Sequence, residues 1–326
     1  MSQKHWADQS EKTSHWGIVF LLTIYRYFGR LPFRILLGPV VLFYWLCDHN
    51  IRANSLKYLQ NAHQFGLIKQ RPNLWLSLHH VAFFGETILD KFLAMTCHDD
   101  HSTLNIENDE MIMQCIARKQ GAIVLTSHMG CVEKLMQHGV QLQNVEIIVL
   151  LHSLHAKELN AMLRSSSTPQ GKIKFIEVTD LTPASACEIE SYVQRGALVF
   201  IAGDRVPIAS EATCQIPFLN QTAHFPIGGV ILANLFHCPL FSITCWRTPL
   251  ARHALREQTN HYTVRFGNLS CGNAVRLDRR SRSNDISHLM QQFAKELETG
   301  LRHSPLDWFN FYDFWQAKGN LKNREH

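Results

Sequence analysis

Runs of consecutive apolar residues alternate with amphipathic stretches along most of this chain, from about residue 100 onward. The apolar runs predict strands at 122–127, 145–151, 173–178, 197–203, 239–246 and 262–269. The stretches with helical periodicity lie at 108–120, 131–143, 155–166, 183–195 and 286–302. Runs without polar alternation are typical of strands that are buried on both faces of a mostly parallel sheet. The pattern therefore predicts an α/β fold, a layered and mostly parallel sheet flanked by helices.

The N-terminal part, residues 16–47, is rich in leucine, aromatic residues and arginine. Its uncharged runs are shorter than the ~20 residues that a spanning helix needs. Three arginines four residues apart would mark one helical face: Arg26, Arg30 and Arg34. Pro32 and Pro39 are expected to interrupt that helix. The segment favours a helix at the membrane interface, with its arginines at the lipid phosphates. An ordinary helix pair packed on the core and one tilted span are the alternatives.

We expect two regions, a membrane-association segment at 1–48 and an α/β domain at 49–326. The net charge of +5 suits an anionic partner, whereas the scattered basic residues do not favour nucleic acid. The nine cysteines form no C-x-x-C pair, which indicates a reducing compartment and no structural zinc site. No G-x-S-x-G, G-x-G-x-x-G or P-loop pattern is present, so serine hydrolase, dinucleotide-binding and NTPase functions lose support.

Two blocks of sequence, 118–128 and 193–205, share one layout: a helix end, a glycine, a buried strand and an abrupt polar cluster. The first cluster contains His128, and the second contains Gly203, Asp204 and Arg205. Ligands of open parallel sheets bind outside the carboxyl ends of the strands. The two clusters are therefore predicted to line one site.

His128 is followed five residues later by Glu133. Positions five apart diverge by about 140° on a helix, so the two side chains can meet only if the chain bends, which Gly130 permits. A carboxylate bonded to one imidazole nitrogen would leave the other free to act as a general base. A purely structural histidine is the simpler alternative. A second alternative is that Cys131, at a helix start beside a histidine, is a nucleophilic thiolate.

The stretch HFPIGG at 224–229 contains Phe225, Pro226 and Gly228. A proline at a helix start and closely approaching glycines could present helix N–H groups to an anion, although a plain helix entry fits equally well. The histidines of the chain lack the spacing of a helical zinc site, so no metal is expected.

The segment IVLTSHMGCVE resembles the H-x4-[DE] signature of the lysophospholipid acyltransferase superfamily. The chain as a whole is similar to the lipid A biosynthesis acyltransferase branch, and within it to predicted acyltransferases of aryl polyene pathways. The stretches that carry this resemblance are YRYFGRLPFRILLGPVVLFY, LTSHMGCVE, HAKELNAMLR, FIEVTDLTPASA, ALVFIAGDRVP, IPFLNQTAHFPIGGVILAN and PLDWFNFYDFW. Cys131 stands where relatives carry asparagine, and His152 stands near the place of an arginine in the lipid A enzymes.

The resemblance implies O-acyl transfer at the cytoplasmic face of the bacterial inner membrane, without a cofactor. The donor would be an acyl carrier protein thioester, carrying a fatty or an aryl polyene acyl group, and the acceptor a lipid or glycolipid hydroxyl. His128 would deprotonate this hydroxyl, and Glu133 would orient His128. Arg164 and Arg205 would hold a phosphate group or the developing oxyanion. A Cys131 acyl-enzyme and a non-catalytic lipid-binding relative remain as alternatives.

Overall fold

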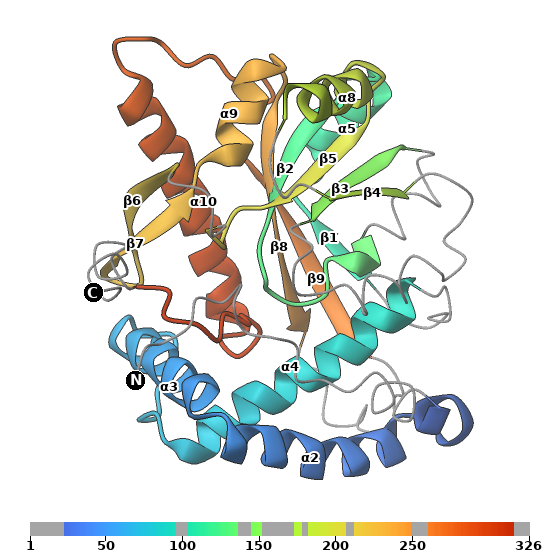
Figure 1. Cartoon of the computed structure of the whole chain (residues 1–326), viewed down its shortest axis with the longest axis vertical. Helices are drawn as coiled ribbons and strands as arrows, with labels where there is room; N and C mark the ends of the chain where they lie inside the picture. Colours follow the sequence, from blue (N-terminus) through green and yellow to red (C-terminus); the bar gives the residue numbers. More distant parts are fainter. Residues whose placement is uncertain are drawn as a thin grey trace.

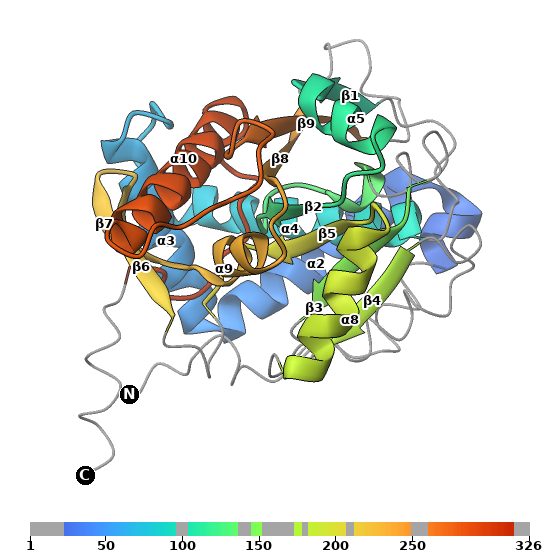
Figure 2. The same ribbon diagram turned by 90° about the horizontal axis from the view of Figure 1, so that it is seen from above.

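A computed structural model describes residues 23–95, 104–135, 145–151, 173–177, 182–206, 212–248 and 260–315. A twisted central sheet stands above three long helices that form the base of the molecule (Figure 1). Further helices cover the two faces of the sheet (Figure 2). The expected helix at 155–166 lies outside the described residues, and of the one expected at 131–143 only 133–135 are described as helical.

The sheet has seven strands in the order β1-β9-β8-β2-β5-β3-β4. In chain order the strands are β1 (Leu104–Glu107), β2 (Ala122–Thr126), β3 (Ile147–Leu151), β4 (Ile173–Glu177), β5 (Leu198–Ala202), β8 (Leu240–Thr248) and β9 (His261–Asn268). Within this described sheet every pairing is parallel except β8 with β9. The predicted fold class, a mostly parallel α/β sheet, is confirmed.

Successive residues of the central strands enter two different cores. In β2, Ile123 and Leu125 pack in one core with side chains of α8 (Pro183–Gln194), α9 (Gly228–Leu235) and α10 (Arg282–His303). Ala122 and Val124 pack in the other core, which includes α5 (Glu110–Ala117). Both faces are therefore apolar, which is why these strands read as unbroken hydrophobic runs.

A separate two-stranded hairpin, β6 (Thr213–Phe218) and β7 (Gln221–Pro226), leads into α9. Its turn residues Leu219 and Asn220 both have positive φ values, 49° and 61°, as a two-residue hairpin turn of type I′ requires. The sequence pattern did not predict this hairpin or β1.

The base consists of α2 (Arg30–Cys47), α3 (His49–Gln64) and α4 (Leu74–Met95). Its own apolar cluster joins Phe33, Leu37 and Val41 of α2 to Leu89 and Leu93 of α4. The expected interruption of α2 by its prolines is wrong, since the helix runs through Pro39 without a break. Pro32 lies in the first turn, where a helix tolerates proline.

We expected the arginines of α2 to point away from the protein, but the structure directs them toward α4. Arg30 is buried and paired with Asp90 of α4, and Arg34 binds Glu86 at 3.1 Å. Only Arg26, before α2, is exposed. Arg30 and Arg34 face the protein because acidic residues of α4 supply their counter-charges, so the expected contact of all three arginines with lipid phosphates needs correction.

Candidate active site

The loop that follows β2 carries His128 and is bound along its length to the C-terminal segment. The Phe309 N–H donates to the His128 carbonyl at 2.8 Å, and the Gly130 N–H donates to the Asp307 carbonyl at 2.9 Å. Gly130 has a φ of 60°, and a Cβ there would lie 2.4 Å from the carbonyl oxygen of Cys245. The bend that the sequence assigned to Gly130 is confirmed, and it leaves no room for a side chain.

His128 is held by Asp204, which follows the neighbouring strand. β2 and β5 are paired in register, with Thr126 opposite Ala202, so the residues two positions further along both chains also meet. Oδ1 of Asp204 lies 2.7 Å from Nδ1 of His128, and Oδ2 accepts the His128 backbone N–H at 2.8 Å. The prediction that these two strand ends meet is confirmed.

The Asp204 carboxylate is completely buried, and its two oxygens accept hydrogen bonds from several donors. Besides His128, Oδ2 accepts from Nε1 of Trp308 and from Nδ2 of Asn310, both at 3.0 Å. Burial alone would raise the pKa of this carboxyl, but the His128 interactions and the Arg205 charge outweigh it and lower the pKa to about 2. Asp204 is therefore ionised, and it fixes the imidazole with its Nδ1–H directed at the carboxylate.

The imidazole of His128 is kept neutral. Burial and the nearby Arg205 charge lower the pKa of His128 below its usual 6.5, although Asp204 acts in the opposite direction. The side chain still exposes 32% of its surface. With Nδ1 occupied, Nε2 carries the free lone pair and can accept a proton.

Glu133 has a different partner from the one that the sequence indicated. Its Oε1 accepts from Nζ of Lys91 on α4 at 2.9 Å. Its Oε2 is buried, with no hydrogen-bond partner among the described residues. The carboxylate that contacts His128 is Asp204, so the expected hydrogen bond from Glu133 is corrected. Glu133 faces Lys91 instead of His128 because the largely buried Lys91 ammonium group needs a counter-charge.

Arg205 fastens the C-terminal segment under the site. Its Nε donates to Oδ1 of Asn310 at 2.8 Å, and an Nη donates to the Phe309 carbonyl at 2.9 Å. Gly203 is packed, since a Cβ there would lie 3.0 Å from the ring of Phe293. Of the predicted polar cluster, Asp204 and Arg205 thus support the loop that carries His128.

The predicted anion site in HFPIGG has a mainly structural setting. Phe225 is fully buried and packs edge-to-face against Phe218, Phe293 and Phe314. Pro226 ends β7, and α9 begins only at Gly228, so the proline is not the first helical residue. Arg164 lies outside the described residues.

Cys131 is also completely buried. Burial and the neighbouring charge of Glu133 raise the pKa of its thiol well above the usual value. A nucleophilic cysteine needs a low pKa and access to substrate. Both properties of Cys131 therefore disfavour an acyl-enzyme.

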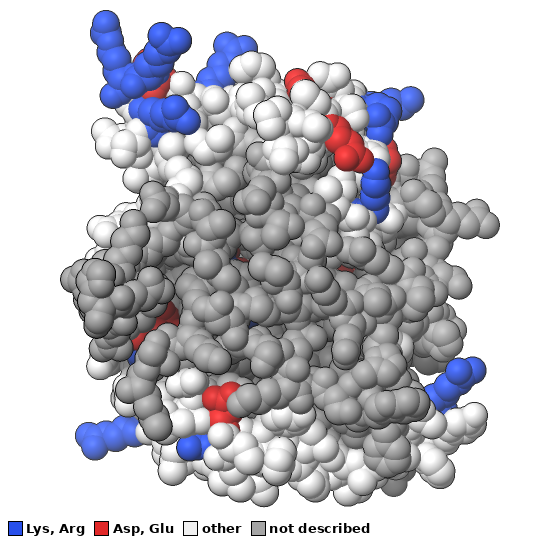
Figure 3. Space-filling view, in the orientation of Figure 1, with Lys and Arg blue, Asp and Glu red and all other residues white. Residues whose placement is uncertain are grey.

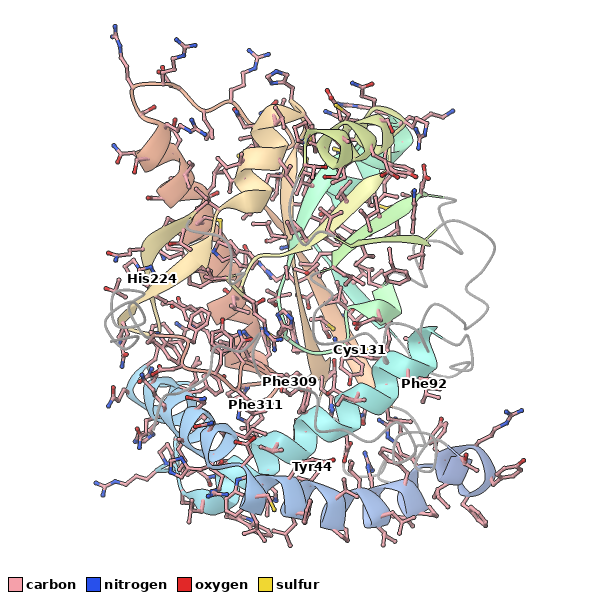
Figure 4. The ribbon with its side chains drawn as sticks, viewed as in Figure 1. Tyr44, Phe92, Cys131, His224, Phe309 and Phe311 are labelled. Atoms are coloured by element: carbon pink, nitrogen blue, oxygen red, sulfur yellow. The ribbon has the colours of Figure 1, made fainter. Side chains whose placement is uncertain are left out.

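The sequence did not identify the C-terminal segment as part of the site. Figure 4 shows Phe309 and Phe311 between the base helices and the sheet, and both rings contact Phe84 of α4. His80 of α4 anchors this segment, because its Nδ1 lies 3.0 Å from Ser55 Oγ and its Nε2 lies 2.9 Å from the Trp308 carbonyl. Burial lowers the pKa of His80 to about 4. The sequence signal that could have identified this segment was the presence of polar residues within its aromatic run at 308–315.

Among the described residues, no group of three or more His, Cys, Asp or Glu side chains could hold a metal ion. A comparison with protein-family models matches residues 68–317 to the bacterial lipid A biosynthesis acyltransferases. The chain belongs to this family. A comparison with curated protein sequences found no match.

Membership of the lipid A acyltransferase family settles the general activity. The protein is an acyltransferase of lipid biosynthesis, with an acyl donor and a lipid acceptor, and its family is associated with bacterial membranes. The resemblance to aryl polyene enzymes remains a prediction. The matched region includes the whole of α4, the His128 loop and the C-terminal segment to Trp315.

Proposed function

We propose that this acyltransferase moves an acyl group from an acyl carrier protein thioester to a hydroxyl of a membrane lipid or glycolipid, with His128 as the general base. The reaction would take place at the cytoplasmic face of the inner membrane. The observation that carries the proposal is the 2.7 Å contact between His128 Nδ1 and the ionised Asp204, which leaves Nε2 able to take a proton.

In the proposed reaction, Nε2 of His128 removes the proton of the acceptor hydroxyl while the oxygen attacks the thioester carbonyl. The resulting imidazolium is stabilised by Asp204, which stays ionised. The tetrahedral intermediate then collapses, the C–S bond breaks, and the imidazolium returns its proton to the departing thiolate. An ester and a free carrier thiol result, and no covalent enzyme intermediate is needed.

Glu133 takes a positioning role in this proposal. Its pair with Lys91 ties the turn after His128 to α4, and the Lys91 charge also helps to lower the pKa of His128. A neutral base near physiological pH is what the first step requires.

The donor assignment is supported by charge. The net charge of +5 suits an acidic carrier protein. Arg205 contributes its charge beside His128 while its guanidinium holds the C-terminal segment. We keep Arg164 as a second candidate contact for a carrier or acceptor phosphate, on the strength of the sequence resemblance.

The test uses purified protein, acyl-loaded carrier protein and a bacterial lipid extract, with the acylated lipid measured by mass spectrometry. His128→Gln should lower the rate by about 10²–10⁴-fold, the usual contribution of a general base, while the thermal unfolding midpoint stays near that of the wild type. His288→Gln, a change at an exposed position of α10, serves as the matched control. Transfer at the wild-type rate by His128→Gln would overturn the assignment. The absence of transfer by the wild type with any acyl donor would indicate a lipid-binding relative.

A further inference from the structure

The outward face of α2 carries most of the exposed large apolar side chains of the described base helices. Leu31, Ile35, Phe43 and Leu46 each expose between 58% and 69% of their surface, and Trp75 in the first turn of α4 exposes 65%. In Figure 3 the lower margin of the molecule, where α2 lies in Figure 1, is a band without charged atoms. Apolar faces of this size in a folded protein mark an interaction surface.

The inward face of the same helix is fixed to the domain. Phe33, Leu37, Val41 and Trp45 are buried there, and Nε1 of Trp45 donates to Ser77 Oγ of α4 at 3.1 Å. The helix therefore has an outside and an inside that are set by packing.

The two inward arginines fix the rotation of the helix further. Asp90, the partner of Arg30, also accepts from Asn260 Nδ2 at 2.8 Å and from the Tyr262 hydroxyl at 2.6 Å. Turning Arg30 outward would leave Asp90 with its negative charge buried and without its cation.

Glu86, the partner of Arg34, also accepts from Arg247 of β8 at 3.3 Å. The polar contacts of α2 thus extend through α4 to β8 and β9. These contacts make the base one unit with the sheet.

By length and composition α2 could cross a membrane, and it is the one described helix that could. A crossing α2 would however carry the α4 surface packed on it, with Glu86 and Asp90, into the hydrocarbon, where charged groups are costly. A helix with one apolar face and aromatic residues at its edge suits the interface instead. Tyr27 and Phe28 before α2 and Trp75 of α4 are exposed aromatic residues of this kind.

We infer that α2 lies in the plane of the membrane, with the face defined by Leu31, Ile35, Phe43 and Leu46 inserted into one leaflet of a phospholipid bilayer. The choice of a bilayer as partner rests on the proposed membrane location. The geometry of attachment is independent of the His128 chemistry, so the two can fail separately. The competing partner of such a face is a second copy of this chain.

The first experiment measures co-flotation of the full-length protein with vesicles of phosphatidylethanolamine and phosphatidylglycerol, without an acyl donor. The double change Ile35→Asp and Phe43→Asp should weaken binding by at least about tenfold, because each places a charge at the lipid-facing surface. Leu235→Asp changes an apolar residue on α9 that is also more than half exposed, and it should have no effect. Unchanged binding by the double variant would overturn the inference. So would a dimer of the wild type that the double variant abolishes in the absence of any vesicle binding.

The second experiment separates an in-plane helix from a spanning one. Arg26→Cys, at an exposed position just before α2, and the native, exposed Cys47 lie at the two ends of the helix. With Cys97 and the exposed Cys187 and Cys271 replaced by serine, a membrane-impermeant maleimide should label neither end in intact spheroplasts and both ends in inside-out vesicles. Labelling of one end from each side would show a crossing helix and would overturn the inference, whatever the outcome of the His128 experiment.

Discussion

Replacing Asp204 with asparagine should separate catalysis from stability. The amide is almost the size of the carboxyl group but has one acceptor oxygen where Asp204 has two. Three donors converge on Oδ2, from the His128 backbone, Trp308 and Asn310, so the amide oxygen should take that place. The NH2 group then faces Nδ1 of His128 and forces the proton onto Nε2. In this tautomer Nε2 can no longer accept a proton, and the base is lost.

The size of both effects follows from the structure. The wrong tautomer should lower kcat by about 10²–10⁴-fold with little change in KM, since the buried Asp204 acts only through His128. The pKa of Asp204 falls from 3.8 to about 2 on folding, which corresponds to roughly 2 kcal/mol of stability. A carboxyl group whose pKa is lower in the folded than in the unfolded state stabilises the folded protein at pH values above its unfolded-state pKa. This contribution is therefore complete above about pH 4 and is lost as the pH falls toward 2.

The assay combines initial rates of acyl transfer with urea unfolding at pH 7 and pH 3. Asp204→Asn should lose about 2 kcal/mol at pH 7 and less at pH 3, and nitrogen NMR of its histidines should show a changed tautomer for His128. Asp278→Asn, an exposed carboxylate that accepts from the Arg280 N–H, controls for the change of charge. A folded Asp204→Asn enzyme with wild-type kcat would refute the assignment of Asp204 as the positioning residue.

Three further predictions concern the same loop. The acid limb of kcat/KM should be centred below pH 6.5, because burial and the Arg205 charge lower the pKa of His128; a midpoint above 6.5 would contradict this. Cys131→Ala should keep activity within a few-fold, and intact-mass spectrometry of the wild type should detect no acylated Cys131; a loss above 100-fold would favour the acyl-enzyme. Glu133→Gln should lower kcat less than Asp204→Asn does, because Glu133 acts through Lys91, and equal losses would return the orienting role to Glu133.

The sequence was a good guide to the interior of the sheet. β2, β3, β5 and β8 are buried on both faces, so their composition alone identified them. The hairpin of β6 and β7 mixes buried and exposed positions, and β1 is a four-residue edge strand. Such strands are defined by their partners more than by their own composition.

The arginine stripe of α2 shows a different limit. Spacing correctly placed Arg30 and Arg34 on one face, but spacing cannot say which face the protein covers. That choice was made by Glu86 and Asp90, more than fifty residues later in the chain. The apolar residues between the arginines were thus the better indicator of the outward side of α2, since α4 offers the arginines counter-charges.

The same reasoning explains why the meeting of the two strand ends was predicted while the carboxylate beside His128 was not. The topology rule for parallel strands placed His128 and Asp204 together, and the register of β2 with β5 then put Asp204 beside Nδ1. The spacing of His128 and Glu133 describes only a local turn, and it says nothing of Lys91, which reaches this turn from α4 and pairs with Glu133. In a parallel sheet the partner of a strand-end histidine should therefore be sought first at the end of the adjacent strand, because strand register fixes that distance more tightly than a loop does.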